Sequence, residues 1–145
     1  MKPVRRIVCA DGPDGKSRAI ADGPAPEVRT DPARPGFSST FIWATDSTPA
    51  RIDGDPPRVL APPPGGSLCC ILTFPPERAP HRAMQETRTL DFCLVLEGEI
   101  TLVLDTEEVE LRAGDTVVQR GTCHAWRNRS GAPCVIAISS HDATY

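Results

Sequence analysis

This chain of 145 residues has few aromatic residues, a small net charge and no long apolar runs. Phe, Trp and Tyr make up 5% of its residues, and its formal net charge is −3. Its arginines are scattered among aspartates and glutamates, so no basic stripe is offered to nucleic acid or to an anionic membrane. No segment has the length needed to cross a bilayer, and the apolar stretch near Lys2 and Arg5 is too short for a secretory leader. We therefore expect a cytoplasmic protein with a small-molecule ligand.

The spacings typical of disulfide frameworks or structural zinc sites are also missing. Of the six cysteines, Cys69 and Cys70 are adjacent, and no Cys-x-x-Cys pair occurs. The other cysteines lie inside apolar, strand-like runs. The sequence therefore predicts free, buried thiols.

Proline and glycine divide the chain near residue 66. The first part holds most of the 16 prolines, and no segment of it predicts a helix. Runs rich in β-branched and aromatic residues predict strands at residues 4–9, 18–21 and 37–45. At this length we expect one domain, with residues 1–66 as a Pro/Gly-rich arm that adds edge strands to the same fold or reaches to a partner.

Residues 67–145 are expected to form the core of the fold, because regular apolar runs begin at Ser67. Asp105 to Glu107, like the turn around Gly98, joins two apolar runs at the spacing of a hairpin loop. Short strands at this spacing predict an all-β sandwich or barrel. The expected strands are residues 67–74, 89–96, 99–104, 108–111, 116–119, 123–128 and 134–139.

The strand at residues 90–96 has two largely apolar faces. Leu90, Phe92, Leu94 and Leu96 alternate with a second set that contains Asp91, Cys93 and Val95. One face can line an interior, and the other needs cover from the N-terminal strands or from a second subunit. We expect a homodimer.

Two stretches resemble the sequence motifs of the cupin family. The segment Gly114–Asn128 resembles the second motif, with a Gly-Asp turn, a glycine at 121, and His124 followed by asparagine four residues later. The segment Asp91–Glu99 resembles the end of the first motif, in which an acidic residue precedes the glycine of a hairpin by seven positions. The glycines and Asn128 are interpreted as structural residues of turns.

The resemblance is strongest to small single-domain cupins of aromatic and polyketide pathways. Matching segments include Gly15–Ser17, Asp22–Pro26 and Met84–Phe92, so the similarity extends over most of the chain. It implies a cupin barrel, that is, a double-stranded β-helix or jelly roll, with N-terminal extension strands.

The chain departs from the metal-binding pattern of that family. Where a metal-binding cupin places two histidines and a glutamate in its first motif, this chain has Gln85, Thr87 and Asp91, and His124 is the one imidazole at a motif position. Amide and hydroxyl oxygens are weak ligands for transition metals. We therefore expect no cofactor, with a divalent transition metal held by Gln85, Asp91 and His124 as the alternative. His81 is either a replacement ligand or a solvated loop residue.

Asp91 and His124 are the candidate catalytic pair. A buried carboxylate needs a partner, and we expect the two side chains to lie within direct or one-water hydrogen-bonding reach, as an acid–base couple. Strand parity places Trp126 and Cys93 on the same interior face as this pair, with Cys93 in a packing role. The candidate substrate-binding residues are Gln85, Thr87, Trp126, Cys93, Trp43 at the opposite wall, and His81.

Three functions are compatible with these residues. The first is acid–base chemistry of the lyase, isomerase or decarboxylase type on a small acid, carbonyl or polyketide-derived aromatic compound. The second, implied by the resemblance, is a metal-dependent oxidoreductase or oxygenase. The third is a cupin that binds a metabolite without turning it over, since one fold hosts many functions.

Overall fold

The structure is a computed structural model, and it describes residues 2–78 and 84–144. Those residues form strands, turns and loops and contain no helix, which confirms the all-β prediction. No helix in this part of the chain is long and apolar enough to span a membrane. The strands are β1 (Arg5–Asp11), β2 (Ser17–Pro24), β3 (Val28–Thr30), β4 (Ser38–Thr45), β5 (Ser67–Phe74), β6 (Gln85–Glu86), β7 (Thr89–Glu97), β8 (Glu99–Val103), β9 (Glu108–Arg112), β10 (Thr116–Arg120), β11 (Cys123–Arg127) and β12 (Cys134–Asp142).

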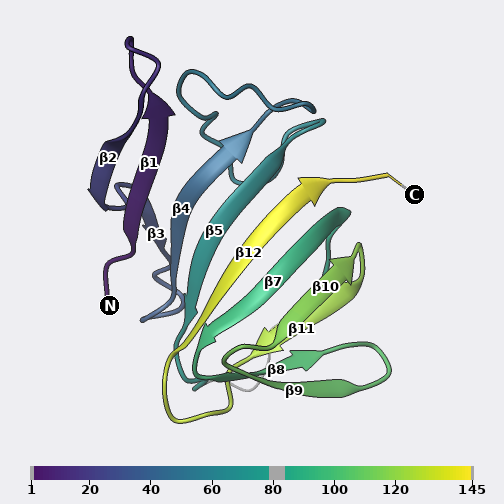
Figure 1. Ribbon diagram of the computed structural model, residues 1–145. Helices are drawn as coiled ribbons and strands as arrows, with labels where there is room; N and C mark the ends of the chain where they lie inside the picture. Colours follow the sequence, from purple (N-terminus) through teal and green to yellow (C-terminus); the bar gives the residue numbers. More distant parts are fainter. Residues whose placement is uncertain (1, 79–83, 145) are drawn as a thin grey trace.

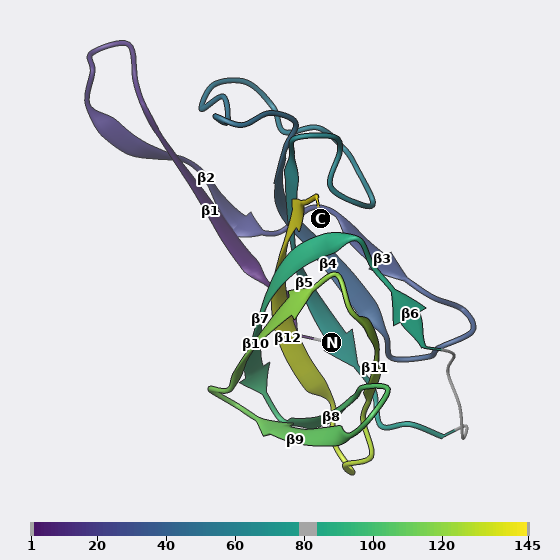
Figure 2. The same ribbon diagram turned by 90° about the vertical axis from the view of Figure 1, so that its right-hand side faces the viewer.

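Two antiparallel sheets face each other and enclose the core (Figures 1 and 2). The larger sheet has six strands in the order β10-β7-β12-β5-β4-β3, and the smaller has four in the order β6-β11-β8-β9. Strands that are neighbours in space are often distant in sequence, as where β12 lies between β5 and β7. The seven strands expected after residue 66 are all present, and the two-residue strand β6 was not anticipated.

The first 66 residues contribute more to the fold than edge strands. The β1–β2 hairpin forms a two-stranded sheet of its own and extends away from the two facing sheets (Figure 2). Strand β4, by contrast, lies inside the six-stranded sheet, hydrogen-bonded to β5 on one side and β3 on the other. The predicted strand at 37–45 is therefore not an edge strand, and the strand that does lie at this edge, β3, was not anticipated.

Strand β7 shows the alternation predicted from its sequence. Asp91, Cys93 and Val95 are buried with exposures of 7%, 4% and 2%, whereas Phe92 and Leu94 are 49% and 40% exposed. The N-terminal strands do not cover this outer face, because β3 and β4 extend the sheet at the edge opposite β10. The inner face packs on the core, whose fully buried members include Ile100, Ile136 and Cys134.

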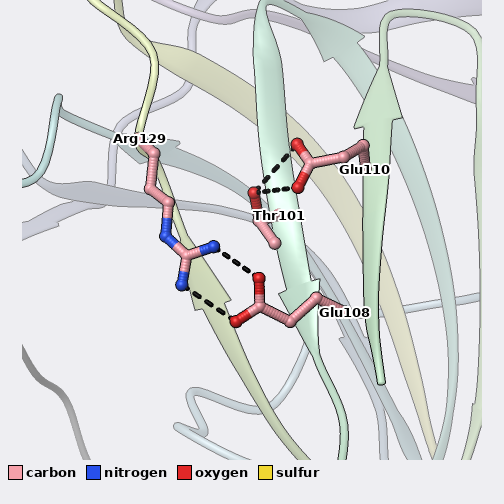
Figure 3. Close-up of polar contacts among 4 residues, drawn as sticks. All are labelled: Thr101, Glu108, Glu110 and Arg129. Carbon is pink, nitrogen blue, oxygen red and sulfur yellow. Dashed lines mark hydrogen bonds and ion pairs between the residues drawn. The ribbon is translucent and has the colours of Figure 1, made fainter.

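Polar contacts link β8, β9 and the loop after β11 in the smaller sheet (Figure 3). The hydroxyl of Thr101 donates to both carboxylate oxygens of Glu110 at 3.0 Å, and the guanidinium of Arg129 forms two hydrogen bonds to Glu108 at 2.5 and 3.0 Å. The guanidinium of Arg129 holds the pKa of Glu108 below its usual value. These contacts fix the loop that follows the strand carrying His124.

Gly98 and Gly114 provide a matched test of turn geometry. Both have positive φ, +79° and +94°, so alanine at either position costs about 1–2 kcal/mol of conformational strain. At Gly98 an added Cβ would also lie 2.5 Å from the carbonyl oxygen of Pro133, whereas at Gly114 nothing lies within 4 Å. We expect Gly98→Ala to lower the free energy of unfolding in urea by at least about 1 kcal/mol more than Gly114→Ala does. Equal losses would show that the close approach at Gly98 is relieved without cost.

Candidate functional site

A cavity of about 610 Å³ opens between the two sheets. Its volume lies in the range of small-molecule sites, roughly 300–1,000 Å³. The lining side chains come from both halves of the sequence and are mostly apolar. Six of the predicted site residues line it, namely Gln85, Thr87, Asp91, Cys93, His124 and Trp126.

His124 lines this cavity and has one ring nitrogen without a partner among the described residues. The residue is 4% exposed, and its Nδ1 lies 2.9 Å from the carbonyl oxygen of Thr122. A carbonyl only accepts, so Nδ1 carries the proton and the neutral ring keeps its lone pair on Nε2. No described residue is hydrogen-bonded to Nε2, and Trp126 packs edge-on against the ring at 6.0 Å. Nε2 is therefore the acceptor available to a ligand.

Asp91 is held by two hydroxyl groups. Thr89 Oγ1 donates to Asp91 Oδ1 at 2.8 Å, and Ser140 Oγ donates to the same oxygen at 2.7 Å. No hydrogen bond joins Asp91 to His124, although both side chains line the cavity. The direct form of the expected pair is therefore not made: Asp91 bonds to hydroxyls on its own and the neighbouring strand, and His124 bonds to the carbonyl of Thr122 just before β11. A contact through one water stays a prediction. The two groups act as separate polar points in the cavity.

Gln85 and Thr87 both line the cavity, and Gln85 lies beside His124. Gln85 on β6 is the cross-strand partner of His124 on β11, which places both side chains on one face of the smaller sheet. The hydroxyl oxygen of Thr87 is buried and has no hydrogen-bond partner among the described residues. An unsatisfied buried hydroxyl costs about 1–3 kcal/mol. It therefore offers a ligand a hydrogen bond that the protein itself leaves unmade.

The cysteines do not supply a nucleophile to the cavity. All six are free, and Cys93 and Cys134 alone are buried, which corrects the expectation that every thiol is buried. Burial, aided by the negative charge of Asp91, raises the pKa of the Cys93 thiol to about 12. The reactive thiolate is then rare at neutral pH. Cys93 belongs to the packed wall, as predicted.

Trp43 does not line this cavity, contrary to the prediction. A bulge in β4 pairs Phe41 with Cys70 but Trp43 with Cys69, so the side chains before and after the bulge face opposite sides of the sheet. Phe41 and Cys70 line the cavity instead. Trp43 borders a separate pocket, where the guanidinium of Arg6 lies 5.9 Å from its ring. His81, also proposed for substrate binding, lies outside the described residues.

The contribution of the N-terminal half and of β12 to the cavity was not predicted from the sequence. Phe37 and Phe41 could have been predicted from the alternation of side chains along the strand-like run at 37–45. The charged residues before this run, such as Arg29, belong to no alternating pattern that would have placed them in the cavity. Ser140 was hidden because its role depends on β12 lying beside β7. The cavity residues not anticipated include Glu27, Arg29, Arg34, Phe37, Ser39, Phe41 and Ser140.

The described donors do not fit the metal site that the family resemblance implies. Among the described residues, His124 is the one imidazole that lines the cavity, Gln85 and Thr87 are neutral oxygen donors, and Oδ1 of Asp91 already accepts two hydrogen bonds. No group of three or more His, Cys, Asp or Glu side chains within residues 2–78 and 84–144 is placed to hold a metal ion. Amide and hydroxyl groups bind transition metals weakly. We therefore derive no chemical step through a metal.

Two facing antiparallel sheets around a mixed polar and apolar cavity define a small β-barrel with a site in its interior. Residues 70–140 match the family model of the cupin domain, Cupin_2, and the chain therefore contains a cupin domain in this region. The predicted cupin barrel is confirmed.

Curated relatives with matching sequences come from fungi. The chain is 46% identical over 76 residues to phomopsin biosynthesis cluster protein D of Diaporthe leptostromiformis, covering 52% of this chain and 38% of that protein. It is 36% identical over 103 residues to a cupin-domain-containing oxidoreductase of Hypocrea virens, covering 64% of this chain and 51% of that protein. The matches thus cover about half or less of these relatives' length.

Solved structures with low sequence identity share the fold. A cupin 2 conserved barrel domain protein from Salinispora arenicola superposes with a TM-score of 0.54 at 17% identity, covering 81% of this chain and 82% of that one. A putative ethanolamine utilization protein from Salmonella typhimurium superposes with a TM-score of 0.55 at 13% identity, covering 99% of this chain and 100% of that one. These similarities concern the fold alone.

Proposed function

We propose that the chain is a small-molecule enzyme of secondary metabolism that uses acid–base chemistry inside its cupin barrel. The observation that carries the proposal is His124, which lines the cavity, whose Nδ1 is fixed by the Thr122 carbonyl and whose Nε2 has no hydrogen-bond partner among the described residues. The names of the fungal relatives, which refer to biosynthesis clusters, support the metabolic setting. The reactions that suit such a site are those of lyases, isomerases and decarboxylases.

In this proposal His124 acts as the general base. Its Nε2 takes a proton from a carbon next to a substrate carbonyl, and the electron pair of the broken C–H bond moves into the enolate. The second oxygen of Asp91, which accepts no hydrogen bond from a described residue, binds a substrate hydroxyl. The unpartnered Thr87 hydroxyl donates to the enolate oxygen as charge develops on it. Return of the proton at the same or another carbon completes an exchange or an isomerisation.

An isotope-exchange screen tests this function without knowledge of the natural substrate. Small 2-oxo acids, 3-oxo acids and hydroxyaryl ketones are incubated with the protein in D₂O, and loss of the proton signal next to the carbonyl is followed by NMR. We expect the protein to accelerate exchange of those compounds that stabilise it in a thermal-shift assay. Compounds that bind in the cavity but exchange no faster than in buffer would contradict the enzyme proposal and favour a metabolite-binding cupin.

A metal-dependent oxidoreductase is the second candidate. The observation in its favour is that relatives 35–37% identical to this chain are named cupin-domain-containing oxidoreductases. Elemental analysis of protein purified without chelator separates the two candidates. A stoichiometric transition metal whose removal abolishes turnover would support the oxidoreductase, whereas metal-free protein that is active in the exchange screen would support the acid–base proposal.

For the quaternary structure we propose a homodimer in which a second copy covers the outer face of β7 and β10. Phe92 and Val118 are direct cross-strand partners there and are 49% and 60% exposed, and Leu94 and Leu96 extend the apolar surface along β7. We expect sedimentation to show a dimer that Val118→Glu dissociates. Ile20→Glu, at a 61% exposed position on the projecting hairpin, is the matched control. A monomeric wild type, or a Val118→Glu dimer, would contradict this arrangement.

A further inference from the structure

Three charged side chains from the N-terminal half line the cavity: Glu27, Arg29 and Arg34. Of these, Arg29 is exposed on the edge strand β3 and marks the rim. Glu27 forms an ion pair with Arg58. Arg34 is ion-paired to an aspartate three residues earlier at 3.2 Å, and its guanidinium lies 3.7 Å from the centre of the Phe37 ring. Glu27 and Arg34 are therefore already paired with other residues of the chain.

Arg29 differs from its two neighbours. It is exposed, it lines the cavity, and it forms no hydrogen bond or ion pair with any residue that the structure describes. On β3 it is the cross-strand partner of Ser39, which pairs in turn with Leu72, and all three side chains line the cavity. The strand register therefore directs the guanidinium along the cavity wall.

The field of Arg29 reaches the interior of the cavity. Burial raises the pKa of the Cys70 thiol, while a hydrogen bond with Ser39 and the positive charge of Arg29 both act to lower it. Cys70 lies on β5, the second strand inward from the edge strand β3. At the other end of the site the carboxylate of Asp91 supplies negative charge on β7. An anionic group is accordingly attracted to the rim and repelled from the interior.

We infer that Arg29 binds the carboxylate of an anionic, ring-bearing substrate at the rim, while the other end of that substrate reaches His124. A guanidinium pairs with a carboxylate through two parallel hydrogen bonds, which fix orientation as well as charge. The apolar part of the cavity lining includes the rings of Phe41, Phe74 and Trp126. These surfaces suit a flat, unsaturated body. This inference names the substrate class of the proposed enzyme, and for catalysis it rests on that proposal.

Calorimetric binding of salicylate and of its uncharged amide, salicylamide, tests the inference directly. The two probes have nearly the same shape and differ in the charged group. We expect the wild type to bind salicylate about 10-fold more tightly than salicylamide, and Arg29→Gln to lose that preference. Arg29→Lys should retain part of it, because it keeps the charge and loses the fork of two donors. Arg18→Gln, on the projecting hairpin, is the matched control and should behave as wild type.

Two results would overturn the inference: equal affinity of the wild type for the two probes, or a salicylate preference that persists in Arg29→Gln. Both measurements are of binding, so they are independent of turnover. If Arg29 controls the preference and no bound carbonyl acid undergoes exchange, the anion site stands and the proposed enzyme function fails. If exchange occurs equally with neutral and acidic compounds, the function stands and the role of Arg29 fails.

Discussion

Replacing His124 by glutamine is expected to lower the rate of proton exchange on a bound substrate by about 10²–10⁴-fold, the contribution typical of a positioned general base. Glutamine retains a polar side chain of similar length, but its amide cannot take up a proton at neutral pH. The affinity for salicylate should change much less than the rate, because the charge-binding residue is Arg29 and not His124. The measurement is the exchange rate at saturating substrate, together with a calorimetric dissociation constant.

His141 is the matched control for this substitution. It lies on β12 with its ring 4.9 Å from that of Phe92, on the outer face of the larger sheet, and it is absent from the cavity lining. His141→Gln should therefore exchange substrate at the wild-type rate. A His124→Gln variant that keeps full activity, or equal losses in both variants, would show that the imidazole in the cavity is not the base.

The Asn128→Ala variant is expected to lose about 2–4 kcal/mol of its free energy of unfolding. Asn128 is 3% exposed, and its amide nitrogen donates to the carbonyls of Phe74 and Ala132 at 3.0 and 2.8 Å. Its amide oxygen accepts from the backbone and the hydroxyl of Ser130 at 3.0 and 2.6 Å. Alanine removes all four hydrogen bonds and leaves the buried carbonyl of Phe74 without this partner, at about 1 kcal/mol for each bond lost.

Ser130→Ala is the variant whose loss of unfolding free energy is compared with that of Asn128→Ala. It removes the hydroxyl that bonds to Asn128, and leaves the amide's two bonds to backbone carbonyls in place. We expect it to cost about 1 kcal/mol in urea unfolding. If the two variants differ by less than about 0.5 kcal/mol, Asn128 does not hold the β11–β12 connection to β5 as described.

Those features of the fold that depend on local pattern were predictable from the sequence. The alternation from Asp91 to Val95 identified the buried face of β7, and the spacing from Gly114 to His124 identified the strand that carries the imidazole. The first rests on the two-residue period of a strand, which is read within a few positions. The second rests on the resemblance of Gly114–Asn128 to the second cupin motif. Six of the eight proposed site residues accordingly line one cavity.

What was missed depends on contacts between distant segments. The bulge that turns Trp43 away from the cavity arises from its pairing with β5, and a single-residue shift of this kind reverses which face a side chain occupies. Asp91 bonds to Ser140 because β12 lies beside β7, an adjacency that local sequence does not encode. Arg29 is exposed and stands in a three-residue strand, too short to show a period.

The proposed function requires that His124 offer an unprotonated Nε2 to a small acid in the cavity, and long-range ¹H–¹⁵N NMR of the imidazole rings measures this directly. The chain has three histidines, so His124→Gln assigns the signal. We predict that neutral His124 carries its proton on Nδ1, and that salicylate shifts its Nε2 resonance while leaving that of His141 in place. A proton on Nε2 in the free protein, or an Nε2 resonance unmoved at saturating salicylate, would contradict the account.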